Sequence, residues 1–367
     1  MKFQKLRDTL DSFLDVDIPG FDCIIYKNHK EIFRYMGGFS DRENKIKMNG
    51  NETYYLYSCT KPIVCTAALT LLEKGKFLLS DPLYSYIPEY ETMYLRNGEK
   101  VKNPILIKHL FSMMAGFNYD VSSPSIMAEK EKNPNASTLD IVKAIAKEPI
   151  DFEPGTKFQY SLCHDVLGAF IEVVSGKTLS EYVTETILDP VGMNRTSFGL
   201  CDKNKDTLAK LYRVEDGEVV LKDQDNSFII TPRYESGGAG LVSCVSDYIL
   251  FADAMANGGL AKNGNKIISQ RTIDLMRMNR LTDDMYKIFS QGQNSGYGYG
   301  LGVRTMINPA DSGVLAPIGE FGWDGAAASY VSILPEENLS VFYAEHVLGG
   351  KHAYVHPRLK NSLYACL

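Results

Sequence analysis

The sequence lacks several features that mark whole classes of protein. No run of about 18 apolar residues occurs along its 367 residues, so no transmembrane helix is expected. The first 14 residues lack the apolar segment of a signal peptide, and apolar side chains recur there at helical spacing. We therefore expect an amphipathic surface helix over residues 1–14, with an apolar face formed by Phe3, Leu6, Leu10 and Phe13.

Paired cysteines and an excess of basic residues are also missing. The seven cysteines are scattered without a Cys-x-x-Cys pair, which argues against a disulfide framework and for a cytoplasmic protein. Lysine and arginine total 39 against 45 aspartates and glutamates, a formal net charge of −6. Proteins that bind nucleic acid or anionic membranes carry a basic excess. We therefore expect neither as a partner, and a small molecule as the ligand.

Strand-like segments lie near both ends of the chain. With 44% hydrophobic residues, the chain can bury a large core. Two β-rich runs, at 21–26 and 32–36, flank a turn at 28–30 and predict a hairpin. Two further β-rich runs lie at 326–334 and 339–344. The simplest packing joins all four runs in one antiparallel sheet.

Helices are expected between the two groups of strands. The segment 81–198 has a mostly helical pattern that prolines interrupt. This order predicts an α+β protein, in which an antiparallel sheet is flanked by helices and a mostly helical insert lies beside it. We expect a single domain over 1–367, with an α/β lobe of 1–80 and 235–367 and a helical lobe of 81–234.

The segment around Ser58 carries the central motif. Pro62 lacks an N–H group and is tolerated in the first turn of a helix, so a helix over 58–74 must begin near Ser58. Lys61 then lies on the same helix face as Ser58, and no other serine has a lysine three residues later. A serine at a helix N-terminus beside a desolvated lysine can act as a nucleophile with its base. The alternative is an N-cap serine followed by a solvated lysine.

Further segments extend this motif into a resemblance over nearly the whole chain. Phe152-Glu-Pro-Gly155 followed by Tyr160-Ser161 resembles the pattern F-x-P-G-x-x-x-x-Y-S, and the segments 107–116, 189–193 and 236–251 match other family patterns in the same order. The family is the serine β-lactamase and penicillin-binding-protein superfamily. Within it, the sequence is similar to the esterase branch related to class C β-lactamases.

This resemblance implies both a fold and a mechanism. The fold is that of β-lactamases and DD-peptidases, and the mechanism forms an acyl-enzyme on Ser58, with Lys61 and Tyr160 sharing the proton transfers. The backbone N–H groups of Ser58 and Ala326 would form the oxyanion hole. No metal or organic cofactor is expected. The alternative for Tyr160 is a packing role, since the chain has 22 tyrosines.

The sequence departs from β-lactamases at two of the family's motifs. Leu162 stands where the second motif has asparagine, and Trp323, Asp324 and Gly325 occupy the third, which is K-T-G in β-lactamases and W-G-G in esterase-like members. We expect these four residues at the substrate. Because a carboxylate at position 324 should repel an anion, the departures favour esterase-type hydrolysis or acyl transfer on a small neutral or cationic acyl substrate. Asp324 either binds a substrate ammonium, faces solvent or pairs with a nearby arginine or lysine.

Other patterns and functions compete with this interpretation. Cys163 and His164 are adjacent on a helix and point in different directions, which disfavours a thiol dyad. His352 and His356 have the spacing of metal ligands, yet no third ligand accompanies them. Two alternative functions stay open: a β-lactamase or D-amino-acid amidase or peptidase, and a non-catalytic binding or sensor protein on the same scaffold.

Overall fold

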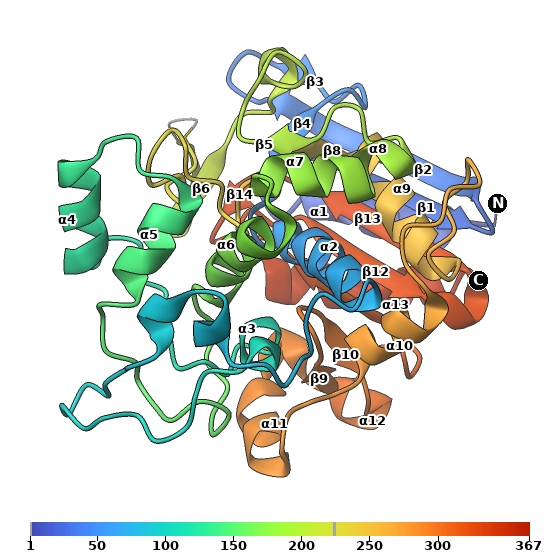
Figure 1. Ribbon diagram of the computed structural model, residues 1–367. Helices are drawn as coiled ribbons and strands as arrows, with labels where there is room; N and C mark the ends of the chain where they lie inside the picture. Colours follow the sequence, from blue (N-terminus) through green and yellow to red (C-terminus); the bar gives the residue numbers. More distant parts are fainter. Residues whose placement is uncertain (1, 223–224) are drawn as a thin grey trace.

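The computed structural model describes residues 2–222 and 225–367. Its central layer is an eight-stranded antiparallel sheet in the order β3-β2-β1-β13-β12-β11-β10-β9. Near its middle, β1 (Gly20–Lys27) from the start of the chain pairs with β13 (Leu339–Ala344) from the end, so blue and red strands lie side by side in Figure 1. The expected antiparallel sheet from the two chain ends is confirmed.

The N-terminal hairpin forms as the sequence predicts. β1 pairs with β2 (Lys30–Asp41), and the turn residues Asn28 and His29 have φ values of 52° and 63°, as a two-residue type I′ turn requires. Helix α1 (Gln4–Leu14) precedes the hairpin and buries Leu6, Leu10 and Phe13 of the predicted apolar face between the sheet and the C-terminal helix α13 (His352–Tyr364), while Phe3, just before the helix, is partly buried.

The C-terminal strands depart from the prediction at one turn. The run expected over 326–334 becomes a strand only at Tyr330, because the chain turns sharply between Gly325 and Ser329. The Gly325 N–H donates to the Ser329 carbonyl at 2.8 Å, and Ala328 has a φ of 69°. This turn joins β11 (Phe321–Asp324) to β12 (Tyr330–Leu334).

Helix α2 (Thr60–Glu73) runs through the centre of the molecule. A 3₁₀ turn, η1 (Tyr57–Cys59), precedes it, and Gly75, with a φ of 64°, follows its end. The helix is buried from Thr60 to Leu71, because it packs between β11 and the helical block. On the sheet, α9 (Val245–Ala256) covers β1, β12 and β13. The remaining helices include α3 (Ile107–Phe111), α4 (Pro124–Lys132), α5 (Thr138–Ile145), α6 (Cys163–Ser175), α7 (Leu179–Val183), α8 (Asp189–Val191), α10 (Gln270–Arg277), α11 (Asp283–Phe289) and α12 (Pro309–Ser312).

The lobe expected to be mostly helical, 81–234, also contains strands. A hairpin forms at Asp216-Gly217, where both residues have positive φ, and an Asp-Gly turn of this kind is a signal that the sequence does carry. The hairpin continues into a small sheet with a strand near the C-terminus, and the division into two lobes stays a prediction. The hairpin strands are β6 (Tyr212–Glu215) and β7 (Glu218–Leu221), and the other strands not yet given bounds are β3 (Ile46–Lys47), β4 (Thr53–Tyr55), β5 (Ser197–Phe198), β8 (Leu241–Cys244), β9 (Tyr297–Tyr299), β10 (Arg304–Met306) and β14 (Val347–Leu348).

Two further observations concern the described residues as a whole. Among them, no helix combines the length and the apolar character that a membrane crossing requires. All seven cysteines lie within the described part of the chain, and each is a free thiol.

Candidate active site

Ser58 lies in η1, directly before α2, and lines a cavity of about 450 Å³. The residue before it, Tyr57, has a φ of 45°, a left-handed conformation that costs energy for a residue with a side chain. Pro62 lies in the first turn of α2, as predicted. Only 8% of Ser58 is exposed, so its hydroxyl reaches the cavity from a largely buried position.

Lys61 is fully buried one turn along the chain from Ser58. Its Nζ lies 3.0 Å from Ser58 Oγ and donates to the carbonyl oxygen of Gly238 at 2.8 Å. Burial lowers the pKa of Lys61 to about 8, although the nearby carboxylate of Asp165 acts in the opposite direction. An amine with this pKa is partly neutral near physiological pH, so it can accept a proton from the serine.

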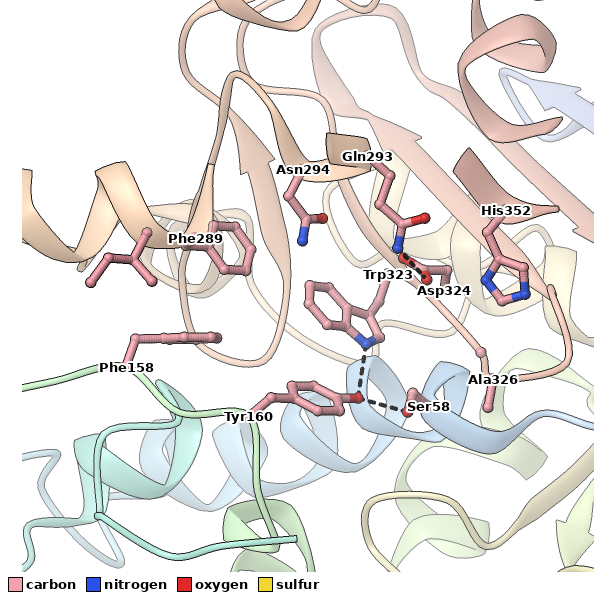
Figure 2. Close-up of a pocket in the computed structure, with 12 residues that line it drawn as sticks. Ser58, Phe158, Tyr160, Phe289, Gln293, Asn294, Trp323, Asp324, Ala326 and His352 are labelled. Carbon is pink, nitrogen blue, oxygen red and sulfur yellow. Dashed lines mark hydrogen bonds between the residues drawn. The ribbon is translucent and has the colours of Figure 1, made fainter. Parts of the chain in front are cut away.

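Tyr160 completes the group that the sequence predicted. Its hydroxyl donates to Ser58 Oγ at 2.6 Å, and the indole N–H of Trp323 donates to the Tyr160 oxygen at 3.2 Å (Figure 2). Burial raises the pKa of the Tyr160 phenol, while the hydrogen bonds with Ser58 and Trp323 lower it. The Lys61 ammonium lies 4.7 Å from the centre of the Tyr160 ring. The side chains of Lys61 and Tyr160, from two separate segments, therefore both contact the hydroxyl oxygen of Ser58.

Two groups beside Lys61 were not identified from the sequence. The Tyr119 hydroxyl lies 3.4 Å from Lys61 Nζ, and its ring stacks on that of Tyr160 at 5.5 Å. No motif marks this tyrosine among the 22. Asp165 is buried and accepts hydrogen bonds from Tyr234 and Ser236 at 2.7 and 2.6 Å.

The glycine-rich segment that follows Ser236 passes close to Asp165 and Lys61. A side chain at Gly238 would place its Cβ 2.7 Å from an Asp165 oxygen and 3.4 Å from Lys61 Nζ. A glycine is therefore needed where this segment passes the buried lysine and carboxylate.

The third motif forms the cavity wall opposite Tyr160. Trp323 and Asp324 lie on β11, and the Asp324 carboxylate forms an ion pair with Arg304 of β10. Burial acts to raise the pKa of Asp324, but the Arg304 guanidinium outweighs it and holds this pKa below its usual value. Of the roles left open for Asp324, pairing with a nearby arginine is the one observed. The expectation that a free carboxylate at position 324 repels anions was therefore wrong, because Arg304 neutralises the charge of Asp324.

Of the other two residues predicted to contact the substrate, Leu162 lies in the core and Gly325 lines the cavity. Leu162 is 2% exposed and packs in the main hydrophobic core, so its placement at the substrate is corrected: burial of an apolar side chain at the start of α6 is favourable. Gly325 lines the cavity, and a Cβ there would lie 2.3 Å from the Leu56 carbonyl oxygen. This close approach brings the exposed Ala326 beside Ser58, as Figure 2 shows.

The rest of the cavity comes from elements that no motif marked. The end of α11 and the 3₁₀ turn η6 (Gly292–Asn294) supply several of its walls. The apolar lining residues are Phe158, Ile288, Phe289 and Trp323, and the polar ones include Gln293, Asn294, Asp324 and His352. Among the described residues that line the cavity, none is a lysine or an arginine.

The residues of the two competing patterns lie in α6 and α13, and of these four residues His352 lines the cavity. Cys163 and His164 are both buried in α6, and burial lowers the pKa of His164 to about 3. The rings of His352 and His356 lie 5.4 Å apart at the start of α13. Within the described ranges, no group of three or more histidine, cysteine, aspartate or glutamate side chains is arranged to hold a metal ion.

An antiparallel sheet flanked by helices, with a Ser-x-x-Lys sequence at the start of the central helix, defines the class of serine β-lactamases and penicillin-binding proteins. The chain belongs to the beta-lactamase family, whose model matches residues 6–362.

Two relatives match most of the chain, and one of them is an esterase. Esterase EstB of Burkholderia gladioli is 26% identical, over 84% of this chain and 81% of its own length. Protein Rv1367c of Mycobacterium tuberculosis is 27% identical, over 92% of this chain and 87% of its own length. Among solved structures, EstCE1, described as a hydrolase with promiscuous acyltransferase activity, has a TM-score of 0.83 over 98% of both chains. At 23% identity, this likeness shows the shared fold.

Proposed function

We propose that this protein is an esterase-type serine hydrolase that acts through an acyl-enzyme on Ser58. The observation that carries the proposal is the contact of one serine oxygen with Lys61 Nζ at 3.0 Å and with the Tyr160 hydroxyl at 2.6 Å, at the wall of a cavity. The similarity to EstB, an esterase, and to EstCE1, a hydrolase, supports the same activity. The expected substrate is a small-molecule ester.

The geometry supports a two-step mechanism. Neutral Lys61, together with Tyr160, takes the proton of Ser58 as its oxygen attacks the ester carbonyl. The backbone N–H groups of Ser58 and Ala326 would stabilise the oxyanion, by about 3 kcal/mol each. Collapse breaks the bond to the alcohol, which leaves with the proton held by Lys61 and Tyr160. Water then attacks the acyl carbon, the same base takes its proton, and Ser58 is released.

The cavity wall favours an ester over a β-lactam. The lysine and hydroxyl residue that hold a carboxylate in the family's K-T-G motif are replaced by Trp323 and Asp324. The nearby cation, Arg304, is 2% exposed and engaged by Asp324, so it is not free to bind a substrate anion. Hydrolysis of β-lactams or D-amino-acid amides is therefore the second candidate.

The state of the cysteines bears on the cellular location of the protein. Seven free thiols are typical of a protein kept in a reducing compartment, and we propose a cytoplasmic location on that ground.

The test is covalent labelling with a fluorophosphonate probe, combined with hydrolysis of p-nitrophenyl acetate and butyrate. Wild type should be labelled and should hydrolyse both esters, whereas Ser58→Ala should do neither. Ser122→Ala, at an exposed serine outside the cavity, is the matched control and should behave as wild type. A folded wild type that neither reacts with the probe nor cleaves the esters would overturn the proposal and favour a binding or sensor protein.

A further inference from the structure

The cavity has two chemically different ends. Figure 2 shows Phe158 and Phe289 on one side of Trp323, with Gln293, Asp324 and His352 on the other side, towards Ala326. At the apolar end, the rings of Phe158 and Phe289 meet at 5.0 Å, and Phe289 stacks on Trp323 at 6.5 Å. An ester bound at Ser58 would therefore meet apolar surface in one direction and polar atoms in the other.

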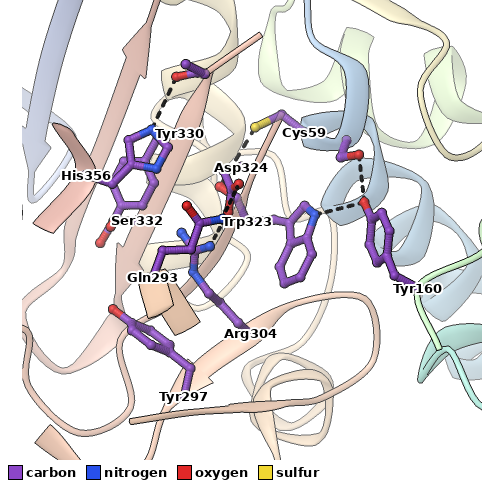
Figure 3. A network of polar contacts seen from close by, with 12 residues as sticks. Cys59, Tyr160, Gln293, Tyr297, Arg304, Trp323, Asp324, Tyr330, Ser332 and His356 are labelled. Atoms are coloured by element: carbon purple, nitrogen blue, oxygen red, sulfur yellow. Dashed lines mark hydrogen bonds and ion pairs between the residues drawn. The ribbon is translucent and has the colours of Figure 1, made fainter. Parts of the chain in front are cut away.

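The polar end is held rigidly by a buried cation. Arg304 pairs with Asp324 and lies over the rings of Trp323, Tyr297 and Tyr330 at 5.4 to 5.6 Å, as Figure 3 shows. These contacts fix the guanidinium, which in turn fixes the ionised carboxylate. The pair has no net charge, so this wall presents hydrogen-bond acceptors without a strong preference for a charged ligand.

One oxygen of Asp324 faces a weak partner. Arg304 engages Oδ1, while among the described residues Oδ2 accepts one hydrogen bond, a long one of 3.4 Å from the Gln293 amide. The Asp324 side chain is 12% exposed at the cavity wall. A ligand that donates a hydrogen bond to this oxygen would improve on the contact already present.

Two other polar atoms at the cavity have unmet hydrogen-bonding capacity. In the part of the chain that the structure describes, His352 Nε2 and Asn294 Oδ1 are buried without a hydrogen-bond partner, and both residues line the cavity. Leaving such atoms unpaired is unfavourable, because each has lost its hydrogen bonds to water without gaining a new one. Burial lowers the pKa of His352, so the imidazole is neutral at neutral pH and one of its nitrogens donates while the other accepts.

We propose that the natural ester carries an uncharged group that donates and accepts hydrogen bonds, a hydroxyl or an amide, on one side of its scissile carbonyl. The polar end bounded by Asp324, Gln293 and His352 binds this group, and the aromatic end binds an apolar group on the other side. The proposal rests on the esterase function proposed above. It replaces the substrate ammonium considered for Asp324, because Arg304 already supplies the positive charge.

The test compares phenyl esters with different acyl groups. The 3-methylbutyrate, 3-hydroxybutyrate and 3-aminobutyrate differ only in the substituent on carbon 3 and are nearly isosteric, and the hydrogen glutarate has an unbranched chain that ends in a carboxylate. Wild type should show kcat/KM about tenfold higher on the hydroxy ester than on the methyl ester. The amino ester should rank below the hydroxy ester, and the glutarate should be the poorest. A matching pair of benzoate esters, with the hydroxyl on the alcohol side, tests the other orientation.

Gln293→Met tests whether the polar end is the cause of this preference. It removes the amide at nearly constant volume and should reduce the ratio of hydroxy to methyl ester by about fivefold. Gln291→Met, at an exposed glutamine two residues earlier, should keep the wild-type ratio.

Each negative outcome has a separate meaning. Equal kcat/KM for the hydroxy and methyl members of both orientations, or a preference for the amino ester or the glutarate, overturns the inference. So does a ratio unaffected by Gln293→Met. Fluorophosphonate labelling of Ser58 in the same preparation distinguishes these results from failure of the esterase proposal, which would abolish labelling as well.

Discussion

The two walls of the cavity follow the family to different degrees. The side that holds Ser58, Lys61 and Tyr160 keeps the family's residues, and their contacts meet at a single oxygen. The side formed by Trp323 and Asp324 departs from β-lactamases and is rebuilt around a buried arginine. In the proposed mechanism the two walls have different roles: the first wall transfers protons, and the second selects the substituents that fit beside the scissile ester.

The largest expected effect comes from removing the base on the first wall. Lys61→Met should lower kcat by about 10⁴-fold, because the serine loses the amine that accepts its proton. Steady-state kinetics with p-nitrophenyl butyrate measure this loss. Lys76→Met, an exposed lysine beyond the end of α2, serves as the control and should retain full activity. A Lys61→Met loss below tenfold would mean that another group acts as the base.

On the second wall, the largest expected effect is on stability. Arg304→Met leaves the Asp324 carboxylate buried without its partner and should lower the free energy of unfolding by about 3–5 kcal/mol. Urea unfolding followed by circular dichroism measures the change. Arg304→Met combined with Asp324→Asn should recover most of the loss, and Arg271→Met, at an exposed arginine of α10, should cost little. A single variant as stable as wild type would contradict a structural role for the pair.

The pH dependence of kcat/KM tests the role of Lys61 on the first wall without a mutation. Lys61 has a pKa of about 8 and acts as a base only when neutral, so kcat/KM should rise with pH and level off above 8. The neutral fraction grows by about 50-fold between pH 6 and pH 8, and kcat/KM should grow with it. Because burial lowers the pKa of both His164 and His352, these histidines cannot produce such a profile. A midpoint below pH 6.5 would argue against Lys61 as the base.

The same contrast explains what could be predicted from the sequence. Ser58, in the 3₁₀ turn η1, and Lys61, in the first turn of α2, are only three residues apart, so local geometry alone brings them together. Tyr160 was found through a family pattern, not through its contacts. The central strands β1, β2, β12 and β13 were predicted because they have clear β-rich runs, whereas the outer strands of the sheet were not. The Asp216-Gly217 hairpin was also missed, although its turn signal was present.

The second wall depends on contacts that are distant in the sequence. Arg304 and Asp324 are paired across two adjacent strands, and no local pattern predicts which buried carboxylate an arginine will meet. Leu162 was assigned to the substrate from its motif position alone, whereas the packing of α6 places it in the core. The residues of α11 and η6 belong to no family motif, so only the folded chain shows that they line the cavity.

The contact between the two walls gives the smallest expected effect and the sharpest test of their separation. The Trp323 indole donates to the Tyr160 oxygen at 3.2 Å and lowers the pKa of that phenol. Trp323→Phe removes this donor and keeps much of the ring, so kcat should fall by about tenfold with little change in KM. Phe289→Leu, which alters only the apolar lining, should instead change KM. If Trp323→Phe instead changes KM and leaves kcat unchanged, as expected for Phe289→Leu, then Trp323 shapes the cavity without assisting Tyr160. The two walls would then be chemically independent.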